Sequence, residues 1–82
     1  MQKASVTYDQ EADILYVRLL DSPVASTHAI DDLRLIDYSE DRAVVGVEFL
    51  QVSDGVDLTD LPHRPKVERL IDESGYQIRI LA

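Results

Sequence analysis

The sequence predicts an α+β fold: a small antiparallel β-meander built from two similar hairpins, one short C-terminal helix packed on the sheet, and a closing strand. Residues 8–20 and 38–50 are spelled alike, and each runs from a tyrosine through a polar, mostly acidic turn into seven mainly apolar residues. That order is typical of a hairpin bend followed by a buried strand. Helical spacing of apolar residues appears only after residue 65, and a strand-like alternation closes the chain over residues 76–81.

The first repeat contains the strongest strand. Residues 4–8 predict a short strand, and residues 9–13 predict a turn in which the Asp9 carboxylate accepts hydrogen bonds from backbone N–H groups downstream. Residues 14–20 predict a strand with two distinct faces, because successive side chains alternate. The face expected to point at the core is apolar and consists of Leu15, Val17 and Leu19. The opposite face consists of Ile14, Tyr16 and Arg18.

Three further strands lead into and through the second repeat. Proline cannot donate to a strand ladder, so Pro23 ends the preceding strand, and residues 24–30 predict a weaker strand at an edge of the sheet. After a turn at Asp31 and Asp32, the pattern predicts a strand, a bend and a strand over residues 33–38, 39–42 and 43–52. The positions that match the core-facing ones of the first repeat are Val45, Val47 and Phe49.

Alignment of the two repeats predicts contacts between them. Where the first repeat has Tyr16, the second has Gly46, and where the first has Arg18, the second has Glu48. A glycine within a strand often marks the close approach of another group. If the two strands lie side by side, we expect the Tyr16 ring to cover Gly46, and Arg18 to pair with Glu48.

The last third of the chain predicts a loop, a helix and a strand. Residues 56–64 predict a loop that Leu58 and Leu61 anchor to the core. Pro65 suits the first position of a helix, and Gly75 suits its C-terminal cap. The apolar stripe of this helix consists of Val67, Leu70 and Ile71. The closing strand, residues 76–81, is expected to turn Tyr76, Ile78 and Ile80 inward.

The chain length and composition limit the organisation of the protein. Because 82 residues leave no room for a second core, we expect one domain over residues 1–82, with the core repeat at 6–52 and the helix and final strand at 65–82. The chain has no cysteine, which excludes disulfides and thiolate metal sites.

The charge balance limits the partners. Sixteen acidic residues face eight basic ones, for a formal charge of −8, and the two lysines, Lys3 and Lys66, stand far apart. Since nucleic acids and anionic membranes are bound largely through basic side chains, we expect neither as a partner. The same charge favours a basic protein. No apolar run is long enough to span a bilayer and no signal peptide is recognisable, so we expect a cytoplasmic protein.

Two groups of carboxylates and two histidines are the candidates for chemistry. Asp9, Glu11 and Asp13 alternate as in a calcium loop, but Ile14 and Leu20 occupy the positions where that loop needs glycine and glutamate. The second acidic group lies at predicted bends and consists of Asp31, Asp32, Asp37, Glu40 and Asp41. Acid–base catalysis requires a desolvated carboxylate, whereas bends are exposed. The histidines, His28 and His63, lie 35 residues apart, without the spacing of a zinc site. We therefore expect no catalytic, cofactor-binding or metal-binding residues.

These observations favour a non-enzymatic protein-interaction module. Its partner would be a second copy, in a homodimer, or a basic protein, and its contact would be an edge strand, either residues 24–30 or residues 76–81. The alternative is a small enzyme or metal-binding domain that uses the carboxylates of the two bends. A structural subunit of a larger assembly is a third possibility, which the sequence does not separate from the first.

Three segments of the first fifty residues, 6–9, 11–19 and 36–48, resemble a known family. They contain a Tyr-Asp-x-Glu-Ala-Asp bend that begins at Tyr8 and a Val-Gly-x-Glu strand that begins at Val45. Both are similar to the YuzE-like bacterial domain of unknown function, family 2283 of the domains of unknown function. The chain departs from it at Leu33, where relatives commonly have glycine. The resemblance implies a small antiparallel fold in a bacterial cytoplasm, with no assigned catalytic residues. It also suggests the acidic, antitoxin-like half of a toxin–antitoxin pair.

Overall fold

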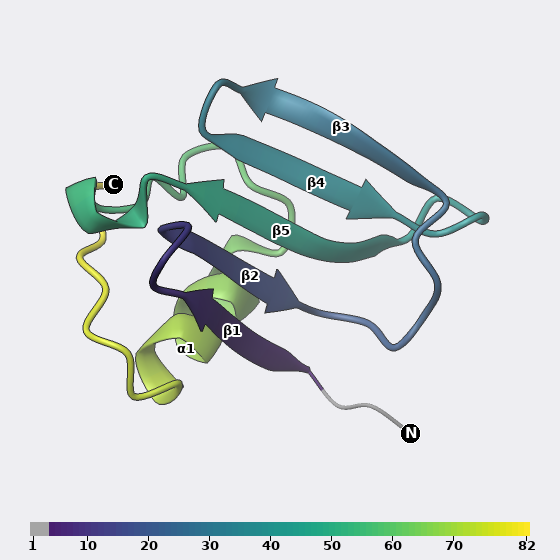
Figure 1. Ribbon diagram of the computed structural model, residues 1–82. Helices are drawn as coiled ribbons and strands as arrows, with labels where there is room; N and C mark the ends of the chain where they lie inside the picture. The colour runs from purple at the N-terminus through teal and green to yellow at the C-terminus, as the bar shows by residue number, and fades with distance from the viewer. Residues whose placement is uncertain (1–3) are drawn as a thin grey trace.

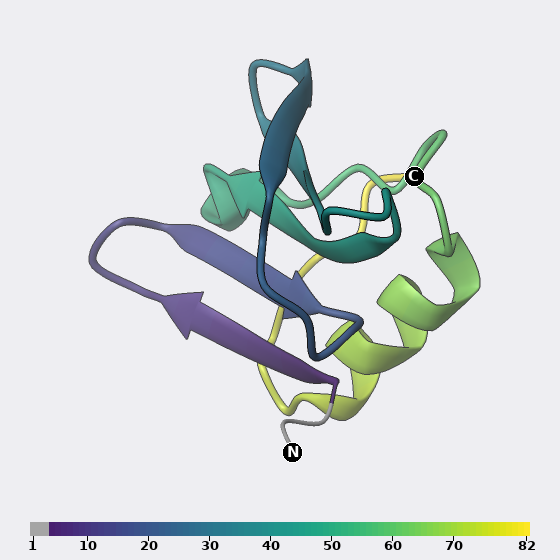
Figure 2. The same cartoon turned by 90° about the vertical axis from the view of Figure 1, so that its right-hand side faces the viewer.

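The computed structural model describes residues 4–82 and has an α+β fold, as the sequence predicts. An antiparallel five-stranded sheet carries one α-helix on one of its faces (Figures 1 and 2). The elements, in chain order, are β1 (Ser5–Asp9), β2 (Ile14–Arg18), β3 (Ser26–Asp31), β4 (Arg34–Tyr38), β5 (Val44–Leu50), the 3-10 helix η1 (Val52–Asp54) and α1 (Arg64–Glu73).

The strand order, which the sequence left open, is β1-β2-β5-β4-β3. Strands β3, β4 and β5 follow one another as a meander, and β5 then lies beside β2 in the middle of the sheet. All four pairs of neighbouring strands are antiparallel. Strands β1 and β3 therefore form the two edges of the sheet (Figure 1).

The two sequence repeats form two hairpins, β1–β2 and β4–β5, that are related by an approximate two-fold axis. Val17 lies opposite Val47 in the central pair of strands, and these two valines occupy the same position of the two repeats. The outer pairings match as well, since Val6 lies opposite Val17 and Ile36 lies opposite Val47. Two copies of one strand pattern thus place their apolar faces on the same side of the sheet, as strand alternation requires.

The core lies between this apolar face and the elements that cover it. All six predicted core positions of the two repeats are buried. Leu58 and Leu61 are also buried, and they belong to the loop after η1, residues 55–63. Burial of each such aliphatic side chain contributes about 1.5–3 kcal/mol to the free energy of unfolding. The buried apolar residues are Leu15, Val17, Leu19, Ile36, Val45, Val47, Phe49, Val52, Val56, Leu58, Leu61, Val67 and Ile71.

The helix α1 follows the predicted pattern. Pro65 stands in its first turn, where the missing N–H of proline has no partner to lose. Val67 and Ile71 are buried on the sheet, and Leu70 is partly buried beside them. Gly75 follows the helix with φ 85°, a left-handed conformation that glycine adopts without the steric cost of a Cβ atom. In the described part of the chain, no helix has the length and apolar character needed to cross a membrane.

The closing strand is where the structure departs from the expectation. Residues 76–81 form no strand, only one parallel bridge between Val56 and Ile80. Their backbone bonds go to the loop after η1, as in the Leu81 N–H to Val56 carbonyl bond of 2.8 Å. The ring of Tyr76 is 40% exposed rather than inward, while Ile78 and Ile80 pack against the core. Alternation correctly predicted that Ile78 and Ile80 face the core, but it was wrong for Tyr76, and it contains no information about a ladder partner.

Candidate functional site

The carboxylates of the first bend are used to hold the bend in shape. Asp9 accepts a hydrogen bond of 3.1 Å from the backbone N–H of Ala12. Asp13 accepts the Tyr8 hydroxyl at 2.9 Å, the Ser53 hydroxyl at 2.6 Å and the Ser53 backbone N–H at 3.0 Å. Asp13 therefore ties the bend to η1, forty positions later in the chain.

These contacts shift the pKa values of Asp13 and Tyr8 in opposite directions. The hydrogen bond from the Ser53 hydroxyl is the main reason that the pKa of Asp13 lies below its ordinary value. The same arrangement raises the pKa of Tyr8, chiefly because its hydroxyl donates to Asp13. A carboxylate with a lowered pKa stays ionised at neutral pH, whereas a general acid needs a raised one.

The second bend repeats this design with a serine. Ser39, the counterpart of Asp9, accepts the backbone N–H of Ala43 at 3.1 Å, and its hydroxyl donates to Asp41. That bond is the main reason that the pKa of Asp41 is lowered. Glu40, next to Asp41 in the bend, is exposed. In each bend the residue after the tyrosine, Asp9 or Ser39, thus accepts a backbone N–H of the same bend.

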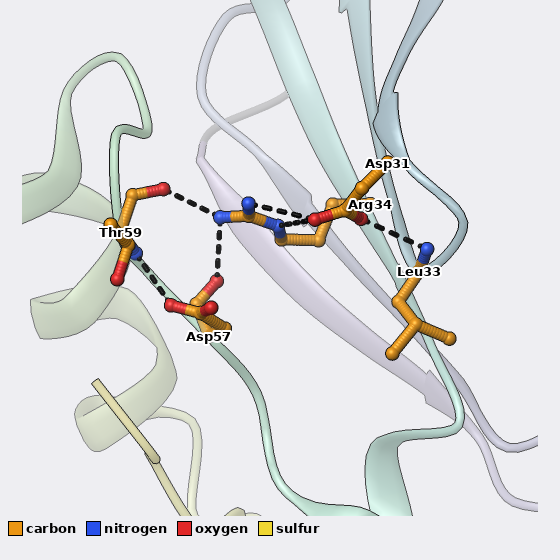
Figure 3. Close-up of polar contacts among 5 residues, drawn as sticks. All are labelled: Asp31, Leu33, Arg34, Asp57 and Thr59. Atoms are coloured by element: carbon orange, nitrogen blue, oxygen red, sulfur yellow. Dashed lines mark hydrogen bonds and ion pairs between the residues drawn. The ribbon is translucent and has the colours of Figure 1, made fainter.

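Strand β4 begins with an arginine, Arg34, whose burial was not predicted from the sequence. Arg34 is only 7% exposed, and its Nε and Nη2 atoms donate to Asp31 Oδ2 at 3.0 and 2.8 Å (Figure 3). Its Nη1 donates to the carbonyls of Asp57 and Thr59 at 3.1 and 2.6 Å. Arg34 therefore fastens the loop after η1 to the sheet. Because side chains alternate along a strand, Arg34 lies on the same face as the buried Ile36, and this alternation could have predicted its burial.

Both carboxylate oxygens of Asp31, at the end of β3, accept hydrogen bonds. Its Oδ1 accepts the backbone N–H of Leu33 at 2.9 Å while Oδ2 faces Arg34 (Figure 3). The Arg34 hydrogen bond is the largest cause of its lowered pKa. The neighbouring Asp32 is exposed.

A polar network crosses the face of the sheet opposite α1. Tyr16 Oη donates to Asp37 Oδ2 at 2.9 Å, and Thr27 Oγ1 donates to Asp37 Oδ1 at 2.6 Å. The Tyr16 ring reaches β4 by passing over Gly46, where a Cβ atom would overlap the Tyr16 hydroxyl. The predicted cover of Gly46 by Tyr16 is confirmed. Partial burial, followed by the bond to Asp37, raises the pKa of Tyr16 to about 12.

The predicted pair of Arg18 and Glu48 is wrong. The strand register places Arg18 opposite Gly46 and Tyr16 opposite Glu48. The Arg18 guanidinium instead lies over the Tyr16 ring, 5.7 Å from its centroid, in a cation–π contact. Alignment of the repeats correctly predicted that β2 and β5 are neighbouring strands. It did not predict which residues lie opposite one another, because the two strands run antiparallel.

The two histidines lie in separate parts of the molecule. His28 is exposed in β3 and meets Tyr38 edge-on, with ring centroids 5.4 Å apart. His63 has a left-handed backbone, φ 55°, directly before α1. Across residues 4–82, no group of three or more histidines or carboxylates is arranged to hold a metal ion.

Strand β3 is the most open element of the sheet. Every residue from Ser26 to Asp31 is exposed, and the strand pairs with β4 alone. At the other edge, Val6 and Tyr8 of β1 are partly buried against the core, and the Tyr8 ring packs edge-on against Tyr76 at 5.7 Å. Figure 2 shows β3 projecting away from α1, on the part of the sheet that the helix does not cover.

An open groove of about 620 Å³ adjoins the start of β3. The segment before β3 forms one side of it, and the β4–β5 bend forms the other. Val24, in this groove, is 46% exposed. The groove is lined by Ser22, Pro23, Val24, Ala25, Ser39, Glu40 and Asp41.

Comparison with known proteins identifies the family. Residues 5–53 match the model of a protein family of unknown function, DUF2283, and this match covers more than half of the chain, so the protein belongs to that family. The match spans both repeats and ends within η1. Comparisons with curated proteins and with solved structures gave no match.

Proposed function

We propose that this DUF2283 protein is a non-enzymatic protein-interaction module, and that its contact is the outer edge of β3. The observation that supports this most is the complete exposure of β3 at an edge of the sheet. An edge strand offers unpaired backbone N–H and C=O groups to another chain, which can add a strand to the sheet.

The sequence of β3 supports strand addition. Edges that must stay unpaired usually carry lysine, proline or inward-pointing charges. Residues 26–30 contain none of these, and the first charged residue is Asp31, at the end of the strand. The irregularity in the pairing with β4 also falls at the end, between Ala29 and Asp31. Most of the edge is therefore regular and open.

Two partners are consistent with this contact. The first is a second copy, which would form a homodimer with one continuous sheet. The second is a basic protein, for which the formal charge of −8 supplies long-range attraction. An acidic, antitoxin-like half of a toxin–antitoxin pair is one form of the second proposal.

An enzyme or metal-binding domain built on the bend carboxylates has less support. Asp13, Asp31 and Asp41 each accept hydrogen bonds, and their pKa values are lowered by those bonds. Their contacts stabilise turns, and none of them is buried in an apolar pocket, which is the usual way to raise the pKa of a catalytic carboxyl.

A pair of matched edge variants tests the proposal. His28→Lys/Ile30→Lys places two charges on β3, and Ser5→Lys/Thr7→Lys places two charges on exposed positions of β1. The protein is purified from its native host, its mass is measured by light scattering and co-eluting proteins are identified. We expect association that the β3 variant abolishes and the β1 variant retains, with circular dichroism confirming that both fold. A monomer without partners, or association that survives the β3 variant, would overturn the proposal.

A further inference from the structure

We infer that the chain which adds to β3 is an extended segment of a basic protein, with lysine or arginine on both sides of an uncharged stretch. This inference rests on the proposed function and names the partner of the same edge. It predicts that one apolar side chain of that segment occupies the groove at the start of β3.

The charge around β3 is strongly negative. Residues 22–42 contain five carboxylates and two arginines. One of these arginines, Arg34, is buried with donors directed at Asp31, Asp57 and Thr59, which leaves Arg42 as the exposed cation of the segment. The carboxylates are those of Asp31, Asp32, Asp37, Glu40 and Asp41.

Four of these carboxylates stand at the two ends of the edge, whereas Asp37 lies opposite Thr27 and accepts hydrogen bonds from Tyr16 and Thr27. At one end, β3 closes with Asp31, which is paired with Arg34, and Asp32 follows; at the other end, Glu40 and Asp41 border the groove where β3 begins. A strand of six residues is about 20 Å long, more than twice the distance of about 8 Å over which physiological salt screens charges. Each end therefore offers its own exposed carboxylates to a cation, and residues 26–30 between them carry no charge of their own.

A second copy fits this edge less well. Two β3 strands paired antiparallel about a two-fold axis place the end of one strand beside the start of the other. Asp31 and Asp32 of one copy would then approach the groove of its partner, which carries Glu40 and Asp41. Like charges held opposite one another destabilise a strand pair, and they disfavour a wrong partner at an interface.

The groove supplies the apolar part of the contact. Pro23, Val24 and Ala25 lie directly before β3, so the groove continues the line of the edge. Its opposite side is held in place, because Ser39 is buried and bonded to Ala43 and Asp41. Strand addition usually combines backbone pairing with pockets for alternate side chains, and this groove provides one such pocket.

Three synthetic peptides test the inference. Each carries Val-Thr-Val-Thr-Val, flanked on both sides by two lysines, two glutamates or two glutamines. Amide chemical shifts of the labelled protein locate the site, and fluorescence anisotropy gives the affinity. We expect the lysine peptide to shift the amides of residues 26–31, to bind at least about tenfold more tightly than the glutamine peptide, and to weaken as salt is raised. We expect no binding of the glutamate peptide.

Matched charge variants assign the effect to the ends of β3. Asp32→Lys/Glu40→Lys changes one exposed carboxylate at each end, and Glu68→Lys/Glu73→Lys makes the same change of charge on the exposed face of α1. The first pair of substitutions should weaken binding of the lysine peptide by about tenfold, and the second pair should weaken it by less than about twofold.

The outcomes separate this inference from the proposed function. Equal binding of the lysine and glutamine peptides at β3 would overturn the basic partner and leave strand addition intact. A dimer that depends on β3 and resists all three peptides would make a second copy the occupant. If the protein is monomeric and without a partner, and no peptide shifts the amides of β3, both the basic partner and strand addition at β3 are overturned.

Discussion

The hairpins β1–β2 and β4–β5 have the same sequence pattern and the same pairing register up to a shift at Tyr38, yet their outer strands meet different surroundings. Beside β1 lie α1 and the segment that follows it, which partly bury Val6 and Tyr8. Beside β4 lies β3, all of whose residues are exposed. The repeated unit therefore builds the core, and the elements added outside it distinguish an edge strand with partly buried side chains from one that is fully exposed.

The largest expected effect tests the shared core of the two hairpins. Phe49 lies in the second repeat at the position that Leu19 holds in the first, and it is almost fully buried. Phe49→Ala should lower the free energy of unfolding by about 3–5 kcal/mol, since it leaves a cavity in the core. Leu19→Ala should cost somewhat less, about 2–4 kcal/mol, because Leu19 lies beyond the end of β2.

Urea unfolding measures both variants, with Leu33→Ala as the control, because Leu33 is 42% exposed. If Phe49→Ala does not fold, Phe49→Leu gives a smaller loss at the same position. A Phe49 variant as stable as the Leu33 variant would contradict the common core.

The next effect belongs to the second hairpin alone. Arg34→Ala removes the donors that hold the carbonyls of Asp57 and Thr59. Unpaired polar groups near the core cost about 1–3 kcal/mol each, so a loss of about 2–4 kcal/mol is expected. Arg42→Ala, at an exposed arginine of the same hairpin, is the control and should be close to neutral. Amide exchange of residues 55–62 should increase in the Arg34 variant, and unchanged exchange would show that the loop does not depend on it.

A third effect concerns the position at which the repeats differ most. Gly46→Ala places a Cβ atom against the Tyr16 ring and 2.8 Å from the Val17 carbonyl. Overpacking of this kind typically costs about 1–3 kcal/mol. When Tyr16 is already replaced by alanine, Gly46→Ala should still lower the free energy of unfolding, but by less than it does in the wild type. The Cβ atom then no longer meets the Tyr16 ring, whereas its contact with the Val17 carbonyl remains. Thermal unfolding decides this, and a Gly46→Ala protein as stable as wild type would refute the contact.

The smallest effect compares the two bends through pH. The pKa values of Asp13 and Asp41 are lowered from the ordinary value of 3.8 by hydrogen bonds in the folded protein. Their ionised forms therefore stabilise the folded state above a pH of about 4, and this contribution is lost as the pH falls through the folded-state pKa values. Asp13→Asn and Asp41→Asn should each reduce the acid sensitivity of unfolding, whereas Glu11→Gln, at an exposed residue of the first bend, should not. Urea unfolding between pH 3 and 7 measures this, and an unchanged acid limb in both asparagine variants would contradict it.

The sequence predicted the covered parts of the molecule better than the open ones. The repeats correctly predicted both bends and all six core positions, because alternation directly encodes the buried face. It did not encode partners: residues 76–81 alternate like a strand but lie beside the loop after η1.

The candidate site was predictable only in part. The edge position of residues 24–30 followed from their polar composition, and it is confirmed. The groove beside β3 and the buried role of Arg34 depend on contacts between distant segments, which one sequence does not reveal.

Hydrogen exchange at β3 is the most direct measurement of strand addition at this edge. Half of the backbone amides of an edge strand point away from the sheet and exchange rapidly with solvent. When the lysine-flanked peptide is added, we expect slower exchange of amides within residues 26–31 and unchanged exchange in β1. Protection that appears in β1, or exchange in β3 that stays as fast as in the free protein, would contradict it.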